Sequence, residues 1–135
     1  MFRDNFWFFT FDFESGHHHL DINYNCWKYL GSSWSFNGVE KYFVFTVLPF
    51  GLSSACHLFT KMFKPLVARW RSLGIFAILN IDDGIFGRRT LSDAQSASKL
   101  VKFDLLNSGW RCNEKKSNWE PRQLGEWLGV IIDTA

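Results

Sequence analysis

Three aspartates, Asp12, Asp82 and Asp83, are the residues of this sequence whose types and spacing could do chemistry. Neighbouring carboxylates repel one another, and a cation between them relieves that repulsion. Mg²⁺ takes oxygen ligands and usually relies on one or two carboxylates plus substrate phosphates. Two such ions, roughly 3.5–4 Å apart, can activate an attacking hydroxyl and stabilise the leaving oxygen in phosphoryl transfer. The alternative is a solvated turn that binds no metal, and residues 75–86 alone do not decide between the two.

The three aspartates can share ions only if the chain brings them together. The aromatic run Phe6–Phe13 predicts a buried strand that ends at Asp12. Two apolar runs within residues 75–86 predict strands joined by a tight turn at Asp82-Asp83-Gly84, because Asp and Gly tolerate positive φ. If the strand ending at Asp12 lies beside this hairpin, all three carboxylates meet at one edge of a sheet.

Further strands are predicted on either side of this hairpin. Trp27–Trp34 and Lys41–Val47 are rich in aromatic and β-branched residues and flank Asn37-Gly38, the strongest short-range hairpin signal. Leu124–Asp133 is expected to form closing strands, and Lys115-Lys116-Ser117 is expected in the loop before them.

Two helices complete the pattern. The first should begin after Ser53 or Ser54, kink or shift its hydrogen bonds at Pro65, and end at Gly74. Its expected apolar face recurs at steps of three and four residues: Ala55, Leu58, Phe59, Met62, Phe63, Leu66 and Trp70. The second should begin at the capping box of Thr90 and end near Ser108. Strands interrupted by two long helices predict an α+β fold, with helices packed on one face of an antiparallel sheet.

Composition sets the broad class. The chain has 135 residues, of which 47% are hydrophobic and 21% charged, so it is long enough for one domain with a core. The net charge of +2 is weak evidence for a nucleic-acid partner. The three cysteines have no metal-ligand spacing, and an odd number argues against a disulfide framework. No apolar run approaches the roughly 20 residues of a membrane span, and the start Met1–Asp4 is not a signal peptide. We therefore expect an intracellular protein, in the cytoplasm or nucleus, without a membrane partner.

Five segments, in order, resemble the motifs of a reverse transcriptase palm, most closely those of DIRS-type and gypsy-type retrotransposons. These segments are Phe11–His19 for motif A, Leu48–Ala55 for motif B, Asn80–Asp83 for motif C, Gly109–Ser117 for motif D and Trp127–Asp133 for motif E. The resemblance implies a polymerase palm-like sheet, with a β-hairpin reaching toward partial fingers. It also implies that residues 1–135 are a single palm with partial fingers, without N-terminal fingers, thumb or ribonuclease H domain.

The resemblance implies a role for each matching position. The expected catalytic residues are Asp12, Asp82, Asp83 and, as the general acid, Lys116. The expected metal ligands are Asp12, Phe13, Asp82 and Asp83. The expected nucleotide-binding residues are Phe13, Glu14, Ser15, Gly16, His17, Phe50 and Gly51. The expected primer and template contacts are Pro49, Asn80, Ile81, Trp127, Leu128 and Gly129. The implied cofactor is Mg²⁺, with Mn²⁺ as an alternative, and the implied partners are an RNA template, a DNA primer and deoxynucleoside triphosphates.

The sequence departs from the family pattern at three positions. Asn80 replaces an aromatic residue that normally lies against the primer end, His17 replaces an aromatic residue that usually excludes a 2′-hydroxyl, and Cys56 replaces a common proline. Two functions remain open. One is an RNA-directed DNA polymerase core, impaired when isolated; the other is an inactive, degenerate retroelement fragment that binds nucleic acid at most weakly. The sequence leaves the oligomeric state open.

Overall fold

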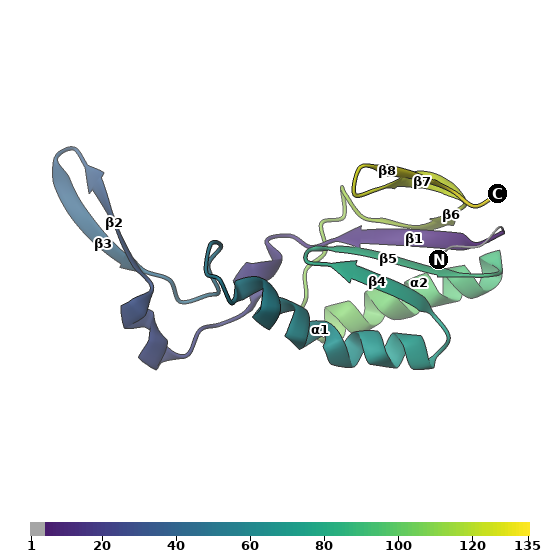
Figure 1. Ribbon diagram of the computed structural model, residues 1–135, viewed down its shortest axis with the longest axis horizontal. Coiled ribbons are helices and arrows are strands. Elements are labelled where there is room, and N and C mark those ends of the chain that lie inside the picture. Colours follow the sequence, from purple (N-terminus) through teal and green to yellow (C-terminus); the bar gives the residue numbers. More distant parts are fainter. Residues whose placement is uncertain (1–4) are drawn as a thin grey trace.

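A four-stranded antiparallel sheet forms the centre of the computed structural model, which describes residues 5–135. Met1–Asp4, where no signal peptide is expected, lie outside the described residues. The strand order is β4-β5-β1-β6, and the strands span Trp7–Asp12 (β1), Phe76–Asn80 (β4), Asp83–Arg88 (β5) and Asn118–Arg122 (β6). Helices α1 (Ala55–Ser72) and α2 (Leu91–Asn107) both cover the same face (Figure 1). This arrangement confirms the predicted α+β fold.

The central strand β1 is buried on both faces. Phe9 and Phe11 face the helices and belong to the main hydrophobic core. Phe8 and Thr10 face the opposite side and are also buried. That side carries the C-terminal hairpin of β7 (Leu124–Trp127) and β8 (Val130–Asp133), which lies above the sheet in Figure 1. Burial on two faces explains why β1 is a continuous aromatic run and does not alternate with polar residues. Since side chains alternate along a strand, Asp12 lies on the hairpin face with Thr10.

Strand β6 is an element that the sequence analysis missed. Asn118–Arg122 is polar and contains Pro121, which cannot donate a ladder hydrogen bond. It pairs with β1 at the edge of the sheet, where a proline is tolerated. The buried hydroxyl of Ser98 on α2 donates to the carbonyl of Trp119 and ties this strand to the helix layer.

The hairpin of β2 (Gly31–Phe36) and β3 (Val39–Val44) projects away from the rest of the molecule (Figure 1). Its turn is Asn37-Gly38, with φ values of 50° and 81°, as the sequence predicts. The predicted strand over Trp27–Trp34 begins too early, because Tyr24–Tyr29 forms a 3₁₀ helix. The side chain of Asn23 caps this helix by accepting the N–H of Asn25.

The predicted helices are present, but the buried face of α1 is narrower than expected. Ala55, Phe59, Phe63 and Trp70 are buried, whereas Leu58 and Met62 are 42% and 57% exposed. The helix also continues through Pro65. In α2 the hydroxyl of Thr90 accepts the N–H of Asp93, as a capping residue should. Neither helix of the described region has the length and apolar character that crossing a bilayer requires.

Candidate active site

The pairing of β1 with β5 places Asp12 directly opposite Asp83. The two strands are antiparallel, and these residues form the last pair of the ladder. Directly opposed side chains lie on the same face of a sheet, here the hairpin face. Asp83 also pairs with Asn80 of β4. Two of the three predicted carboxylates therefore meet at one end of the sheet.

The turn of the β4–β5 hairpin lies earlier than predicted. Asp83 already belongs to β5, so the turn residues are Ile81 and Asp82, and Ile81 has a φ of 53°. Gly84 lies within the strand with no positive φ assigned to it. Its small size is required because a Cβ at this position would approach the Phe11 ring to 2.7 Å. The role predicted for Gly84 from the sequence is therefore wrong. Gly84 makes room for the Phe11 ring, and the β-branched residue Ile81 adopts the strained left-handed backbone of the turn.

Asp82 lies in the turn, outside the ladder that pairs Asp12 with Asp83. Its backbone carbonyl accepts the N–H of Phe13, which holds the turn against the end of β1. Its side-chain Oδ1 lies 3.9 Å from Nδ1 of His17. A Cβ on Gly16 would overlap this oxygen, so the close approach depends on glycine at that position.

The ionised forms of Asp82 and Asp83 are disfavoured at their positions. Burial raises the pKa of Asp83 above its ordinary value, and the neighbouring charges of Asp12 and Asp82 raise it further, while Lys116 acts in the opposite direction. Burial is also the largest cause of the raised pKa of Asp82. Both shifts mean that the ionised forms lack sufficient positive charge nearby. A bound cation would supply that charge.

The donor set fits a hard divalent ion that is also held by its substrate. Among residues 5–135, no three acidic, His or Cys side chains are arranged as a ready-made metal site. Asp12 and Asp83 provide two carboxylates, and Mg²⁺ usually needs only one or two when phosphate oxygens complete its shell. Phe13 could contribute only its carbonyl oxygen, because its ring is 3% exposed and packs in the core.

The loop that carries Lys116 is tied to the end of β1. The N–H of Asn113 donates to the carbonyl of Asp12 at 2.8 Å, and the N–H of Asp12 donates to the hydroxyl of Ser117 at 3.1 Å. The N–H of Lys116 donates to the carbonyl of Asn113. These bonds hold the loop beside the carboxylates, although Asp12 and Ser117 are 105 residues apart in the sequence.

A cavity of about 320 Å³ joins these groups. It is lined by Thr10, Phe11, Asp12, Asp83, Lys116, Glu126, Trp127 and Leu128. The predicted carboxylate pair, the predicted general acid and two predicted primer contacts therefore share one space. Glu126 was missed by the sequence analysis, and the available signal was its position directly before Trp127 in the closing hairpin.

The predicted nucleotide-binding residues divide between two places. Gly16 and His17 are buried beside Asp82, and the exposed Phe50 packs its ring against His17 at 4.7 Å. Glu14 and Ser15 instead line a separate cavity of about 480 Å³ with His18, His19, Gly109 and Arg111. The structure therefore does not bring all of motif A to the carboxylate cavity.

The remaining predicted contacts surround the site without entering its cavity. Pro49 is buried, whereas Gly51, Asn80 and Ile81 are exposed. Gly51 and Gly129 have φ values of 84° and 75°, which glycine adopts without strain. The roles assigned to these residues stay predictions.

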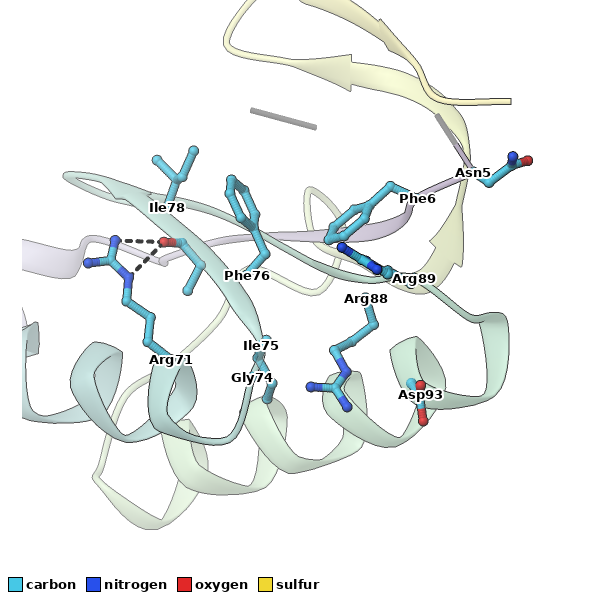
Figure 2. Close-up of a pocket in the computed structure, with 11 residues that line it drawn as sticks. Asn5, Phe6, Arg71, Gly74, Ile75, Phe76, Ile78, Arg88, Arg89 and Asp93 are labelled. Atoms are coloured by element: carbon cyan, nitrogen blue, oxygen red, sulfur yellow. Dashed lines mark hydrogen bonds between the residues drawn. The ribbon is translucent and has the colours of Figure 1, made fainter. Parts of the chain in front are cut away.

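A larger cavity lies at the other end of the sheet. It measures about 1050 Å³, and three arginines, Arg71, Arg88 and Arg89, extend along it (Figure 2). Two of them are engaged with backbone carbonyls: Arg71 donates to Ala77 and Arg88 to Leu73. None of the predicted site residues lines this cavity. Volume alone therefore does not locate the candidate site.

Comparison with known proteins gives one family. Residues 3–132 match the family model described as reverse transcriptase (RNA-dependent DNA polymerase). No curated protein gives a match. Three solved structures illustrate the similar folds. A foamy viral protease-reverse transcriptase dRH in complex with double-stranded DNA has 24% identity and a TM-score of 0.76, over 98% of this chain and 24% of that one.

The two other structures are of the same kind. A foamy viral protease-reverse transcriptase in complex with double-stranded DNA has 25% identity and a TM-score of 0.73, over 98% of this chain and 27% of that one. A mutant Prototype Foamy Virus protease-reverse transcriptase has 20% identity and a TM-score of 0.77, over 98% and 17% of the two chains. This chain spans about a quarter of the length of the first two solved chains.

Proposed function

Because this chain belongs to the reverse transcriptase (RNA-dependent DNA polymerase) family, we propose that it is the polymerase core of a reverse transcriptase that extends a DNA primer on an RNA template. The observation that carries the proposal is the Asp12–Asp83 pair, which lines one cavity with Lys116 and the closing hairpin. In this proposal residues 1–135 are a palm with partial fingers, from a retrotransposon of the DIRS or gypsy type.

Each residue of the site has its own role in the proposed reaction. Two Mg²⁺ ions, or Mn²⁺ in their place, would lower the pKa of the primer hydroxyl and neutralise the phosphates. Asp12 and Asp83 would hold the cations, and Asp82 would contribute from the turn. The primer 3′-hydroxyl loses its proton to water, and its oxygen bonds to the α-phosphorus of a deoxynucleoside triphosphate while the bond to pyrophosphate breaks. Lys116, in the loop held against Asp12, donates the proton that the leaving pyrophosphate accepts.

Positioning of the nucleic acid requires more surface than the cavity offers. Trp127 and Leu128 of the closing hairpin would contact the primer end, next to the carboxylates. Two of the similar solved structures are complexes with double-stranded DNA, and nucleic acid is the partner proposed for this chain. A net charge of +2 gives little general attraction for a duplex. We therefore expect the 135 residues by themselves to extend a primer poorly.

A chimera tests this function directly. These residues would replace the matching part of a foamy viral reverse transcriptase, and RNA-templated primer extension would be measured with Mg²⁺. We expect extension by the chimera, loss of extension with Asp83→Asn, and unchanged extension with the matched control Asp93→Asn, whose carboxylate lines the distant arginine cavity. A correctly folded chimera that binds primer–template but does not extend it would favour the inactive, degenerate fragment. Equal extension by Asp83→Asn would contradict the assigned role of the pair.

A further inference from the structure

Two buried polar atoms beside the carboxylate pair face each other without a partner. Nδ1 of His17 and Oδ1 of Asp82 are 3.9 Å apart, and each is buried without a hydrogen bond. Leaving a buried donor or acceptor unpaired is destabilising. A hydrogen bond would require the two atoms to approach by about 1 Å, since such bonds are typically 2.7–3.2 Å long.

The imidazole is held in place by its surroundings. His17 is 2% exposed, and its ring stacks on Phe59 of α1 with a centroid distance of 4.7 Å and an interplanar angle of 14°. Phe50 packs on it from motif B, also with a centroid distance of 4.7 Å. A Cβ on Gly16 would overlap both Asp82 Oδ1 and the Phe59 ring. The backbone can therefore bring the imidazole to this carboxylate only with glycine at position 16.

Asp82 needs an orienting partner more than its two neighbours do. Asp12 and Asp83 face each other across the sheet and share the cavity with Lys116. Asp82 lies in the turn, and its Oδ1 is directed at the histidine. Of the charges that influence its pKa, His17 has the largest lowering effect, against a rise caused by burial.

We propose that His17 is a positioning residue that donates a hydrogen bond from Nδ1 to Oδ1 of Asp82 when a metal ion binds. This bond satisfies both buried atoms and leaves the second carboxylate oxygen of Asp82 for the ion. Both the imidazolium and the Nδ1–H tautomer of the neutral imidazole carry the required N–H. Partners that orient metal ligands in this way typically change metal affinity by 10–100-fold. The inference rests on the proposed function, because it assigns the orientation to the metal site.

Three substitutions separate the hydrogen bond from the ring packing. His17→Phe keeps the stacking and removes the donor. His17→Asn places an amide N–H close to the position of Nδ1, whereas His17→Gln places its amide farther out, near the position of Nε2. Mg²⁺ affinity would be measured by calorimetry on the whole chain, and the Nδ1 proton of His17 would be followed by NMR.

We expect the Mg²⁺ affinity of His17→Phe to fall at least about tenfold, that of His17→Asn to stay within about threefold of wild type, and that of His17→Gln to resemble His17→Phe. The wild-type Nδ1 proton should shift downfield when Mg²⁺ is added. Wild-type affinity in a folded His17→Phe, or an Nδ1 proton that does not respond to Mg²⁺, would overturn the proposal. Asp83→Asn separates this failure from that of the proposed function. If it weakens binding while His17→Phe does not, only the positioning role is wrong; if wild type binds no Mg²⁺, both are wrong.

Discussion

Replacing Asp83 with asparagine should make the protein more stable than wild type without metal and less stable than wild type when Mg²⁺ is bound. Asp83 lies directly opposite Asp12 in the antiparallel ladder. Its raised pKa is caused first by burial and then by the charges of Asp12 and Asp82. A carboxyl whose folded pKa is raised binds more protons in the folded than in the unfolded state. Its contribution to stability is therefore present below about pH 4 and is lost as pH rises through the raised folded pKa.

The size of the effect follows from the geometry of the pair. Directly opposed charges on neighbouring strands change stability by roughly 0.2–1 kcal/mol, and partial exposure of Asp83 places it near the middle of this range, about 0.5 kcal/mol. Without metal at pH 7, Asp83→Asn should then melt about 1–3 °C above wild type. An ion at ten times its Kd stabilises the folded protein by about 1.4 kcal/mol. With Mg²⁺ at that level, wild type should be the more stable protein.

Thermal unfolding between pH 4 and pH 8, with EDTA and with Mg²⁺, measures both halves of this prediction. Asp93→Asn is the matched control, because its carboxylate is exposed at the start of α2 and should give the same Mg²⁺ response as wild type. A metal-free Asp83→Asn protein that melts below wild type would refute the repulsion between the carboxylates. An equal Mg²⁺ response in both proteins would refute their role as ligands.

Four further substitutions test the packing, capping and turn residues of the fold. Gly84→Ala should destabilise the fold by about 1–3 kcal/mol, measured by urea unfolding, because its methyl group would overlap the Phe11 ring. Thr90→Ala should cost about 1 kcal/mol, since its hydroxyl caps α2, whereas Ser54→Ala should have little effect because that side chain makes no capping bond. Ile81→Asn should raise the free energy of unfolding by about 1 kcal/mol, because asparagine tolerates the left-handed backbone that isoleucine adopts there.

Each of these stability predictions has an outcome that would contradict it. A Cβ on Gly31 would make only an ordinary contact, 3.8 Å from the carbonyl oxygen of Phe43, so Gly31→Ala is the control for Gly84→Ala, and equal losses would refute the packing argument. Equal losses for Thr90→Ala and Ser54→Ala would show that the capping bond contributes nothing. A loss of stability in Ile81→Asn would show that the apolar contacts of Ile81 outweigh its backbone strain.

The strongest local patterns could be predicted from the sequence. The aromatic run ending at Asp12 predicts a buried strand, because an interior strand covered on both faces needs apolar residues throughout. Asn37-Gly38 and Thr90 are similarly local signals with a direct conformational cause. The order of the matching motifs then indicated which two strands would be neighbours, and the ladder pairs Asp12 with Asp83.

Features that depend on distant contacts could not be predicted in this way. Gly84 was interpreted as a turn residue because the ring that fills the space above it comes from a strand more than 70 residues earlier. Strand β6 has a mostly polar sequence, and it is positioned by its pairing with β1 and by the packing of Trp119 on Phe9 and Phe11. The approach of His17 to Asp82 depends on packing against α1, and spacing along the chain carries no sign of it.

The way in which the loop of Lys116 is bonded to β1 also determines when the site can appear during folding. The cavity is lined by segments that run from Thr10 to Leu128, and the bonds between Asp12 and Ser117 span 105 residues. Contacts so far apart in sequence form late, because the entropy of closing the intervening loop must be lost first. The strands that carry Asp12 and Asp83 can therefore pair before the loop of Lys116 and the closing hairpin enclose them. The cavity is complete only once that hairpin has docked on the sheet.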